Sequence, residues 1–577
     1  MSRSVWAVLT CGLLMIALSS PALGGGGPEN VALVVNRRSW SSRTIANYFQ
    51  QLRHIPRINV VDLDWTGDKY RTDIDTFRRD LLRPVLKELD ARRLSHVDYI
   101  VYSSDLPYEI QFSTEKKSDD VYPSGSLTGL TFLYQLSLHP TTHLYAESNT
   151  NWYAAQMMGG RQNPTRAFRS SYAWDDEGNR VERPGPDQPT QRYLLSTMLG
   201  YTGPRGNTVT EVVTGLQRSA AVDGTSPPGT IYYCRNPNVR STTRDANRSF
   251  EMAVAELQRL KVNARIVDGI LPTGAADVQG LMTGVSDFDW KQSRSTILPG
   301  AIAEHLTSFG AVFHGASQTP ISEWIRQGAA GTSGTVIEPY ALPYKFPHPR
   351  IHVHYAHGCS LAEAFFQSVN GPHQLLILGD PLCRPWAKIP TVALRGLEAN
   401  QAVRGELVMQ PQVLAAQGQA IRELRVFLDG LEWGHVPPNQ AIKLVTTNFS
   451  DGFHELRIVA IEESLIESQG RQIIPLWFAQ GEQLPEASLQ PQQDKYDWGQ
   501  PIVVRASLAG ATQLEIYHNR RQLGVSPGEK AEFRVDPQEL GSGPVTLDVV
   551  GVLPGPPQQR VTARPLSFEI GWPASTQ

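Results

Sequence analysis

Cysteine is scarce in this chain, which has four in 577 residues. Cys11 lies inside an apolar run at the N-terminus, which leaves Cys234, Cys359 and Cys383 for the rest of the protein. Three thiols form at most one disulfide and leave one thiol unpaired, so a disulfide framework like that of small secreted domains is excluded. We expect hydrophobic cores to stabilise the fold, and a chain of this length has enough apolar residues for several.

An excess of either charge is also missing. The 53 Lys and Arg residues and the 56 Asp and Glu residues give a formal charge of −3, and no Lys/Arg-rich tract occurs. Because proteins that bind nucleic acid present a basic patch to the phosphates, we expect no nucleic-acid partner. With 41% hydrophobic and 19% charged residues, the composition excludes the disordered and fibrous classes.

Long apolar runs are absent except at the N-terminus. Residues 1–24 place Arg3 before the apolar stretch 5–18 and end in Pro-Ala-Leu-Gly, which is the layout of a secretory signal peptide. We therefore predict that the mature chain starts near Gly25, that no transmembrane segment remains, and that the protein is exported to the periplasm or the extracellular space. Lipid attachment at Cys11 is disfavoured, because this residue lies inside the apolar stretch.

Strand and helix patterns alternate from about residue 29 to 387. Unbroken apolar runs of the buried-strand type, such as 31–35 and 99–102, are separated by segments whose apolar residues recur at helical spacing. This alternation predicts an α/β domain with a mostly parallel sheet and helices on both faces. From about 111 to 190 the pattern gives way to polar sequence with Pro and Gly, which we interpret as an insertion at the rim of the sheet.

After Pro390 the chain repeats itself. Three pairs of segments match in the same order at one spacing of about 90 residues: 424–434 with 514–524, 456–459 with 547–550, and 475–478 with 565–568. Both halves consist of short alternating segments, and Asp-Gly turn signals punctuate the first. The repeat predicts two tandem β-sandwich domains of immunoglobulin-like size, at 391–480 and 490–577.

The most specific motifs lie between residues 327 and 386. They are Gly-Thr-Val-Ile-Glu-Pro at 334–339, Gly-Cys-Ser-Leu-Ala-Glu-Ala at 358–364 and Leu-Gly-Asp-Pro at 378–381. In this order they resemble the closing part of the gingipain-type cysteine peptidases of the caspase clan. The chain looks closer still to an uncharacterised family of exported bacterial proteins from genomes with exosortase-type sorting systems, a family with no assigned activity to carry over.

The resemblance implies a caspase/gingipain-like sheet over residues 29–387 and supplies a test for catalysis. In such peptidases a His follows one strand and the nucleophilic Cys follows the next, so that imidazole and thiol meet at the carboxyl edge of the sheet. The matching places here are Val285 and the segment 301–304, which contain neither residue. We therefore expect the dyad to be missing and none of the three remaining cysteines to act as a nucleophile.

Four polar residues are candidates for a cleft at the carboxyl edge of the sheet. Asp287 and Asp289 follow one predicted strand, His314 follows the apolar segment 311–313, and Glu338 belongs to the Glu-Pro motif. Carboxylates and an imidazole supply acid–base chemistry where they converge. A turn is the simpler interpretation of Asp287 and Asp289, because Asp is common in turns.

A cluster of ligand-type side chains lies around the second motif: His348, His352, His354, His357 and Cys359. On a strand, His352 and His354 would share one face. The spacing matches no standard metal site, and no Cys-x-x-Cys or His-Glu-x-x-His pattern accompanies it. We therefore expect no bound metal and no cofactor.

Two functions from different classes fit these observations. In the first, the protein is exported and non-catalytic, and it acts in recognition or scaffolding in the cell envelope, with an envelope protein or a polysaccharide as its partner. In the second, a hydrolase site at the carboxyl edge of the sheet uses Asp287, Asp289, His314 and Glu338. Convergence of these four side chains in one cleft would favour the second function.

Overall fold

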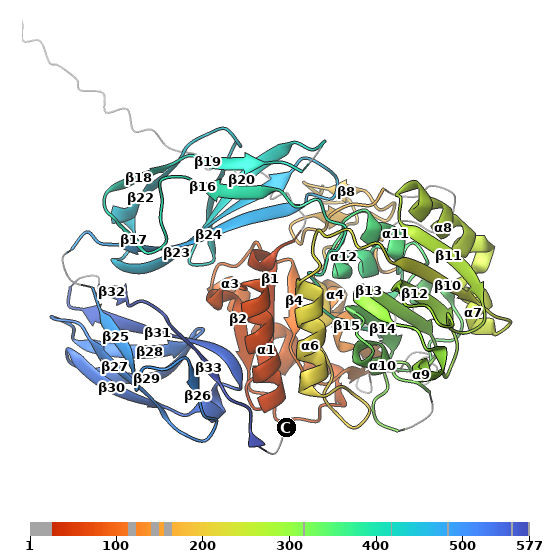
Figure 1. The fold of residues 1–577 in the computed structure, drawn as a ribbon, viewed down its shortest axis with the longest axis horizontal. Helices are drawn as coiled ribbons and strands as arrows, with labels where there is room; N and C mark the ends of the chain where they lie inside the picture. The colour runs from red at the N-terminus through yellow and green to blue at the C-terminus, as the bar shows by residue number, and fades with distance from the viewer. Residues whose placement is uncertain are drawn as a thin grey trace, which may run out of the picture.

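The protein has an N-terminal α/β part and a C-terminal strand-rich part (Figure 1). The structure is a computed structural model that describes residues 26–112, 123–139, 149–154, 164–315, 318–416, 418–481, 484–555 and 558–574. The predicted signal peptide, with Cys11, lies outside the described residues. Within them, no helix has the length and apolar character needed to cross a membrane.

A ten-stranded sheet forms the centre of the α/β part. In spatial order its strands are β11 (Asn263–Asp268), β10 (Thr230–Arg235), β12 (Val278–Gly284), β13 (Ile297–Leu306), β14 (Gly331–Thr335), β15 (Leu375–Gly379), β9 (Leu195–Met198), β4 (Tyr99–Tyr102), β1 (Val31–Asn36) and β2 (Val60–Leu63). Strands β10 to β14 pair with one another in parallel, as do β1, β2, β4 and β9. β15 runs antiparallel to β14 and meets β9 at Leu378 and Met198. The predicted large, mostly parallel sheet is confirmed.

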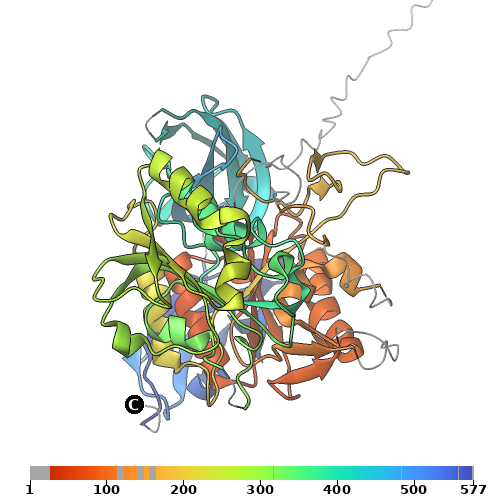
Figure 2. The same ribbon diagram turned by 90° about the vertical axis from the view of Figure 1, so that its right-hand side faces the viewer.

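Helices accompany this sheet, as predicted. They are α1 (Trp40–Arg53), α2 (Ile74–Thr76), α3 (Arg83–Ala91), α4 (Leu127–Phe132), α5 (Tyr134–Ser137), α6 (Val209–Ala220), α7 (Val239–Arg244), α8 (Ser249–Arg259), α9 (Trp290–Ser293), α10 (Ser322–Arg326), α11 (Ile351–Ala356) and α12 (Leu361–Phe366). The chain leaves β1 toward β2 and then crosses back to β4, so right-handed crossovers put α1 and α3 on opposite faces. α1 and α6 lie side by side in front of the sheet in Figure 1, and α8 packs on β11 (Figure 2).

The expected rim insertion at about 111–190 also reaches the core. A small sheet of β3 (Arg71–Asp73), β5 (Glu109–Gln111) and β6 (Ser124–Ser126) leads into α4, all six residues of which are buried. The Phe132 ring lies 4.5 Å from the Tyr193 ring and 4.0 Å from the Phe366 ring. Among the described residues of this range, the stretch 182–189, which follows the hairpin of β7 (Ala173–Trp174) and β8 (Arg180–Val181), is exposed.

Each predicted β-sandwich range contains a large apolar core. The first range holds β16 (Thr391–Leu394), β17 (Gln401–Val403), β18 (Glu406–Met409), β19 (Pro411–Leu414), β20 (Ile421–Leu428), β21 (Leu431–Val436), β22 (Ile442–Val445), β23 (Gly452–Glu462) and β24 (Gln469–Phe478). The second range, together with its approach at 486–490, holds β25 (Glu486–Gln490), β26 (Lys495–Tyr496), β27 (Ile502–Ser507), β28 (Gln513–His518), β29 (Arg521–Pro527), β30 (Lys530–Val535), β31 (Gly543–Leu553), β32 (Gln559–Thr562) and β33 (Leu566–Ile570).

The sequence repeat corresponds to a repeated hairpin. β20 pairs antiparallel with β21, β28 pairs antiparallel with β29, and the register shifts at the equivalent point in both hairpins, after Val426 and after Ile516. A β-bulge of this kind is a specific local feature, so its recurrence explains why this segment keeps the strongest sequence match. The two ranges join edge to edge where Gly452 pairs with Thr562.

Candidate functional site

The candidate site is the carboxyl edge of the sheet, where the loops after β9, β13 and β14 meet. Tyr201, after β9, stacks on Phe313, after β13, with ring centroids 4.4 Å apart. The Thr335 hydroxyl at the end of β14 donates to the Thr307 carbonyl at 3.1 Å. Arg205 donates to the Gly315 carbonyl at 2.6 Å. Side chains from distant parts of the sequence therefore fill this edge.

Of the two strands that would carry a His/Cys dyad, β12 ends where the sequence predicted its end and β13 ends later. β12 ends at Gly284, so the buried Val285 does follow this strand. The segment 301–304, however, lies inside β13, which continues to Leu306. The reason is an irregularity in the middle of β13, where the pairing with β12 shifts register beside Gly300, which has a φ of 83°. The residues that follow the strand are Thr307 and Ser308, and neither is a thiol.

The space beyond β12 and β13 is occupied by the segment that begins at Gln318. The Gln318 side-chain oxygen accepts hydrogen bonds from the Thr307 hydroxyl at 2.7 Å and the Phe309 amide at 2.8 Å. His305 contacts the Thr319 carbonyl at 3.0 Å through Nε2 and accepts the Trp324 indole hydrogen bond at Nδ1. Burial lowers the pKa of His305 to about 4, so this imidazole is neutral at physiological pH and both its nitrogens are engaged.

The three thiols are buried and remain protonated. Burial raises the pKa of Cys234 to about 12 and raises those of Cys359 and Cys383 above the ordinary value for a thiol. Cys359 contacts the Gln367 amide nitrogen at 3.3 Å, and Cys383 contacts the Tyr355 hydroxyl at 3.1 Å. A nucleophilic cysteine needs a thiolate and a nearby base, and these environments favour the inert thiol.

Three of the four predicted cleft residues are carboxylates, and two of them accept a hydrogen bond from the backbone amide two residues ahead. Asp289 caps the N-terminus of α9 by accepting from the Lys291 amide at 2.9 Å, and Asp287 is exposed two residues earlier. Glu338, after β14, accepts from the Tyr340 amide at 2.9 Å. The contact of Asp289 agrees with the turn interpretation of this residue.

Replacing Asp289 by Ala is expected to destabilise the protein by about 1 kcal/mol, the usual effect of losing a helix N-cap. Asp287→Ala is the matched control, because Asp287 caps no helix, and it is expected to change stability by less than about 0.5 kcal/mol. Urea unfolding of the two variants measures the difference. Equal stability losses would contradict the capping role.

His314 is held away from the two aspartates. Its Nε2 lies 2.7 Å from the Arg71 guanidinium, its Nδ1 contacts the Tyr108 hydroxyl, and its ring lies 5.6 Å from the Tyr70 ring. Since an arginine only donates, Nε2 accepts and the ring proton is assigned to Nδ1. Neither ring nitrogen is open to a substrate here. Among the described residues, no hydrogen bond or ion pair joins any two of the four candidates.

Two members of the predicted histidine cluster, His352 and His354, lie on a helix and not on a strand. His352 and His354 belong to α11, where residues two apart point in different directions. His352 contacts the Ile302 carbonyl at 3.2 Å, and His354 contacts the Thr165 hydroxyl at 2.8 Å. The part of the chain that the structure describes contains no group of three or more His, Cys, Asp or Glu side chains suited to a metal ion.

The motifs that carry the family resemblance have structural roles. A Cβ atom at Gly379 would lie 2.1 Å from the Ala330 carbonyl oxygen, so the Leu-Gly-Asp-Pro segment needs glycine there. Asp380 forms a buried ion pair with Arg53, at the end of α1, at 2.5 Å. Ser360 and Glu363 form a capping box at the start of α12, and Glu363 also accepts from the Phe168 amide at 2.9 Å.

Sequence reasoning missed a polar network where the strand order reverses between β1 and β4. Ligands of open α/β sheets bind outside such a switch point. Asp105, after β4, has a φ of 55° and accepts from the Ser39 hydroxyl at 2.5 Å and from the Thr202 hydroxyl. Asn36 donates to the Asp105 carbonyl at 2.8 Å. The carboxylate is thus engaged by the protein's own hydroxyls, and the network ties three loops together.

Comparisons with known proteins give no family. No protein-family model matches the chain, and no curated protein is similar enough to count as a relative. Among solved structures, fibronectin(III)-like modules of Clostridium thermocellum CbhA are 11% identical, with a TM-score of 0.14, over 31% of this chain and 93% of theirs. The Bacteroides ovatus mixed-linkage glucan protein SGBP-B, solved with a mixed-linkage heptasaccharide, is 13% identical, with a TM-score of 0.19, over 31% of this chain and 47% of its own. Dimeric latent PorU from Porphyromonas gingivalis is 12% identical, with a TM-score of 0.13, over 31% of this chain and 20% of its own. At these values no function is carried over.

Proposed function

We propose that the protein is an exported, non-catalytic component of the cell envelope that acts in recognition or scaffolding. In this proposal the α/β part has a caspase/gingipain-like architecture without the His/Cys dyad, and two immunoglobulin-like β-sandwiches follow it. The observation that carries the proposal is the state of the thiols. All three described cysteines are buried with raised pKa values, and none follows β12 or β13.

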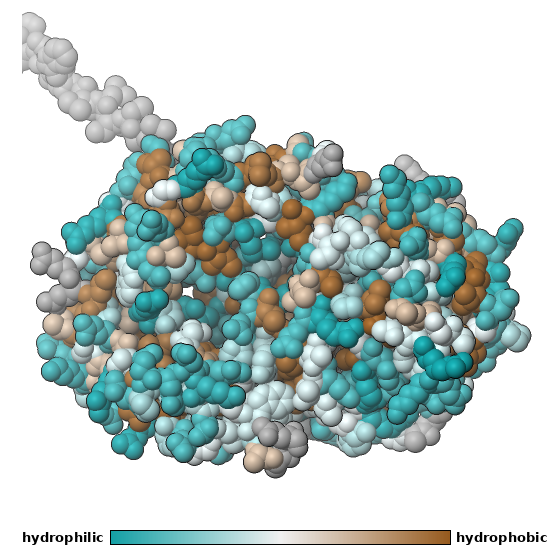
Figure 3. All heavy atoms as spheres, viewed as in Figure 1, coloured by the Kyte–Doolittle hydropathy of each residue, from teal (hydrophilic) through white to brown (hydrophobic). Residues whose placement is uncertain are grey.

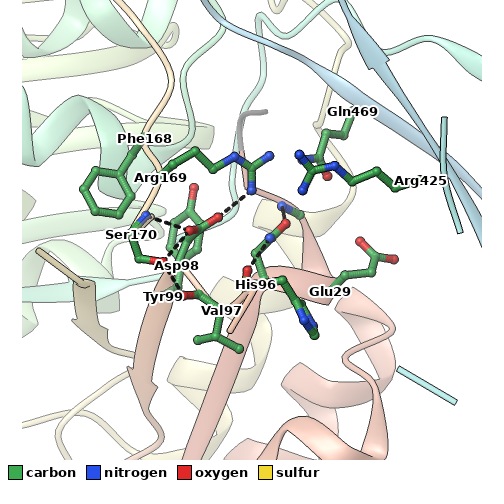
Figure 4. Close-up of polar contacts among 12 residues, drawn as sticks. Glu29, His96, Val97, Asp98, Tyr99, Phe168, Arg169, Ser170, Arg425 and Gln469 are labelled. Atoms are coloured by element: carbon green, nitrogen blue, oxygen red, sulfur yellow. Dashed lines mark hydrogen bonds and ion pairs between the residues drawn. The ribbon is translucent and has the colours of Figure 1, made fainter. Parts of the chain in front are cut away.

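Tight docking of the strand-rich part on the α/β part supports a scaffolding role. In Figure 4 the side chains of Arg425 and Gln469, from the first β-rich range, face Asp98 and Arg169 of the α/β part. Arg169 pairs with Asp98 at 2.5 Å inside the protein. Polar groups of this kind lose their hydration when the two parts dock and must find partners inside the protein, so the buried contacts favour one fixed arrangement.

Contacts of α1 with the second β-rich range add to this docking. The Asn47 side chain donates to the carbonyl oxygens of Leu540 at 3.0 Å and Ser542 at 3.1 Å, and the Trp40 indole donates to the Ser542 hydroxyl at 3.1 Å. α1 therefore holds the second range in addition to covering the sheet. A rigid arrangement of the two parts favours a binding function, because the binding surfaces keep their relative positions.

The purified protein is expected to cleave no member of a broad peptide library, because a peptidase thiol must lie within hydrogen-bond reach of its base. Mass spectrometry of the library before and after incubation measures cleavage, with an alkylated sample of the same protein as control. Cleavage that alkylation abolishes would overturn the non-catalytic proposal. Among the described residues, no hydrogen bond or ion pair joins any two of the four residues of the hydrolase alternative, so no contact favours that function.

A further inference from the structure

A large cavity lies where α1 meets both β-rich ranges. Its volume is about 970 Å³, and Figure 3 shows the surface hollowed at this junction. One wall is α1, with Tyr48 and Gln51; another is β23 and β24, with Arg457 and Arg471; the third is β31 and β33, with Ser567. This volume lies at the upper end of the range for small-molecule binding sites. Such sites often lie where domains meet.

Positive charge in the cavity wall is already neutralised. Arg457 and Arg471 share the buried carboxylate of Glu29, each at 3.2 Å, and Arg457 also pairs with Glu455 at 2.7 Å. Arg57, at the edge of the cavity, pairs with Asp548 at 3.0 Å. Because each of these arginines is paired with a carboxylate, the cavity wall has no excess positive charge that would attract a phosphate or an acidic peptide.

The second β-rich range adds two exposed carboxylates, Asp494 and Glu569. An anionic ligand would face them at close range, which is unfavourable. A hydroxyl group, in contrast, donates to a carboxylate and accepts from an arginine or an amide. The hydroxyls of Thr546 and Ser567, 2.9 Å apart, can donate and accept in the same way.

Apolar surface is interleaved with these polar groups. Tyr48 on α1 and Ile473 on β24 line the cavity, and both are partly exposed. A ligand that fits this cavity has hydroxyl groups that contact the polar side chains, C–H groups that contact the apolar side chains, and no net charge. Sugars combine these features.

We infer that this junction cavity binds a neutral oligosaccharide. The inference rests on the proposed recognition function and names the class of its ligand. It assigns the contacts with sugar hydroxyls to the paired arginines, the exposed carboxylates and the hydroxyls of β31 and β33. Tyr48 and Ile473 supply the apolar contacts with the rings.

The test is calorimetric titration of the full protein with cellohexaose, maltohexaose and chitohexaose, with hexagalacturonate as the anionic counterpart. At least one neutral hexasaccharide is expected to bind, and hexagalacturonate is expected to bind at least tenfold more weakly. Ser567→Trp places an indole in the cavity and is expected to weaken binding at least tenfold. Gln559→Trp, on the neighbouring β32 and outside the cavity, is the matched control and is expected to leave binding unchanged.

Glu569→Gln is a second variant that removes one charge with little change of shape, and it supplies the readout if Ser567→Trp does not fold. It is expected to weaken the neutral sugar about threefold or more. Binding of none of the three neutral sugars, preference for hexagalacturonate, or full affinity in both cavity variants would each overturn the inference. Such a failure leaves the proposed non-catalytic function standing, because that proposal fails only through thiol-dependent cleavage.

Discussion

Replacing Glu29 by Gln is expected to lower the free energy of unfolding by about 3–5 kcal/mol, the usual effect of removing one partner of a buried ion pair. The Glu29 carboxylate is 1% exposed and lies between Arg457 and Arg471, each at 3.2 Å. In the variant, Arg457 and Arg471 lie between the α/β part and the first β-rich range without the negative charge of Glu29. Urea unfolding measures the loss.

The loss is expected to depend on pH. Burial raises the pKa of Glu29, but Arg471 and Arg457 outweigh burial and hold this pKa below its ordinary value. A carboxyl group whose pKa is depressed by folding stabilises the native state above its unfolded pKa, about 4.3 for Glu. That stabilisation disappears as the pH falls through the folded-state pKa, so the gap between wild type and variant should close in acid.

Glu406→Gln is the matched control for Glu29→Gln. Glu406 pairs with Lys443 at 3.6 Å, and both side chains are more than half exposed, so this change is expected to cost less than about 1 kcal/mol. If both variants lost the same stability, or if the Glu29 variant kept its full deficit at low pH, the buried triad would not hold the interface as described.

Arg53→Met is expected to destabilise the α/β part by about 3–5 kcal/mol, because it leaves buried carboxylates without their cation. Arg53, at the end of α1, contacts Asp380 and Asp223 at 2.5 Å each. Methionine keeps much of the side-chain volume, so the effect reports the lost charge rather than a cavity. Thermal and urea unfolding, compared with wild type, give the size of the loss.

Arg79→Met is the control for Arg53→Met, because Arg79 forms an exposed pair with Asp80 at 2.6 Å. Its effect is expected to stay below about 1 kcal/mol. Wild-type stability of the Arg53 variant would show that the Leu-Gly-Asp-Pro motif does not act through this ion pair.

The sequence predicted the features that depend on local pattern. A strand buried on both faces of a parallel sheet reads as an apolar run, which is why 31–35 and 99–102 were recognisable. The repeated hairpins at 424–434 and 514–524 were recognisable because the same bulge and turn constrain both. In each case the residues that fix the structure are neighbours in the chain.

Features that depend on partners far away in the chain were not predictable. Beyond the irregularity at Gly300, β13 continues through the buried polar residues Glu304 and His305. Their partners include the distant Arg244 and Trp324, so the end of this strand was placed too early. α11 is only six residues long, and its histidines pair with groups as distant as Thr165 and Ile302.

The Asp105 network gave no local signal either. Its members come from three loops, and only the strand order brings Ser39 and Thr202 to this carboxylate. Asp105 has a positive φ, which could not be predicted from the sequence because most Asp residues have a negative φ.

Alkylation of the folded protein by iodoacetamide at neutral pH tests directly whether the sheet carries a reactive thiol. Mass spectrometry maps the label to Cys234, Cys359 or Cys383. We predict that none of the three is labelled during a time that labels all of them in urea, because each thiol is buried with a raised pKa. Rapid stoichiometric labelling of a single one of these cysteines in the folded protein would contradict the account.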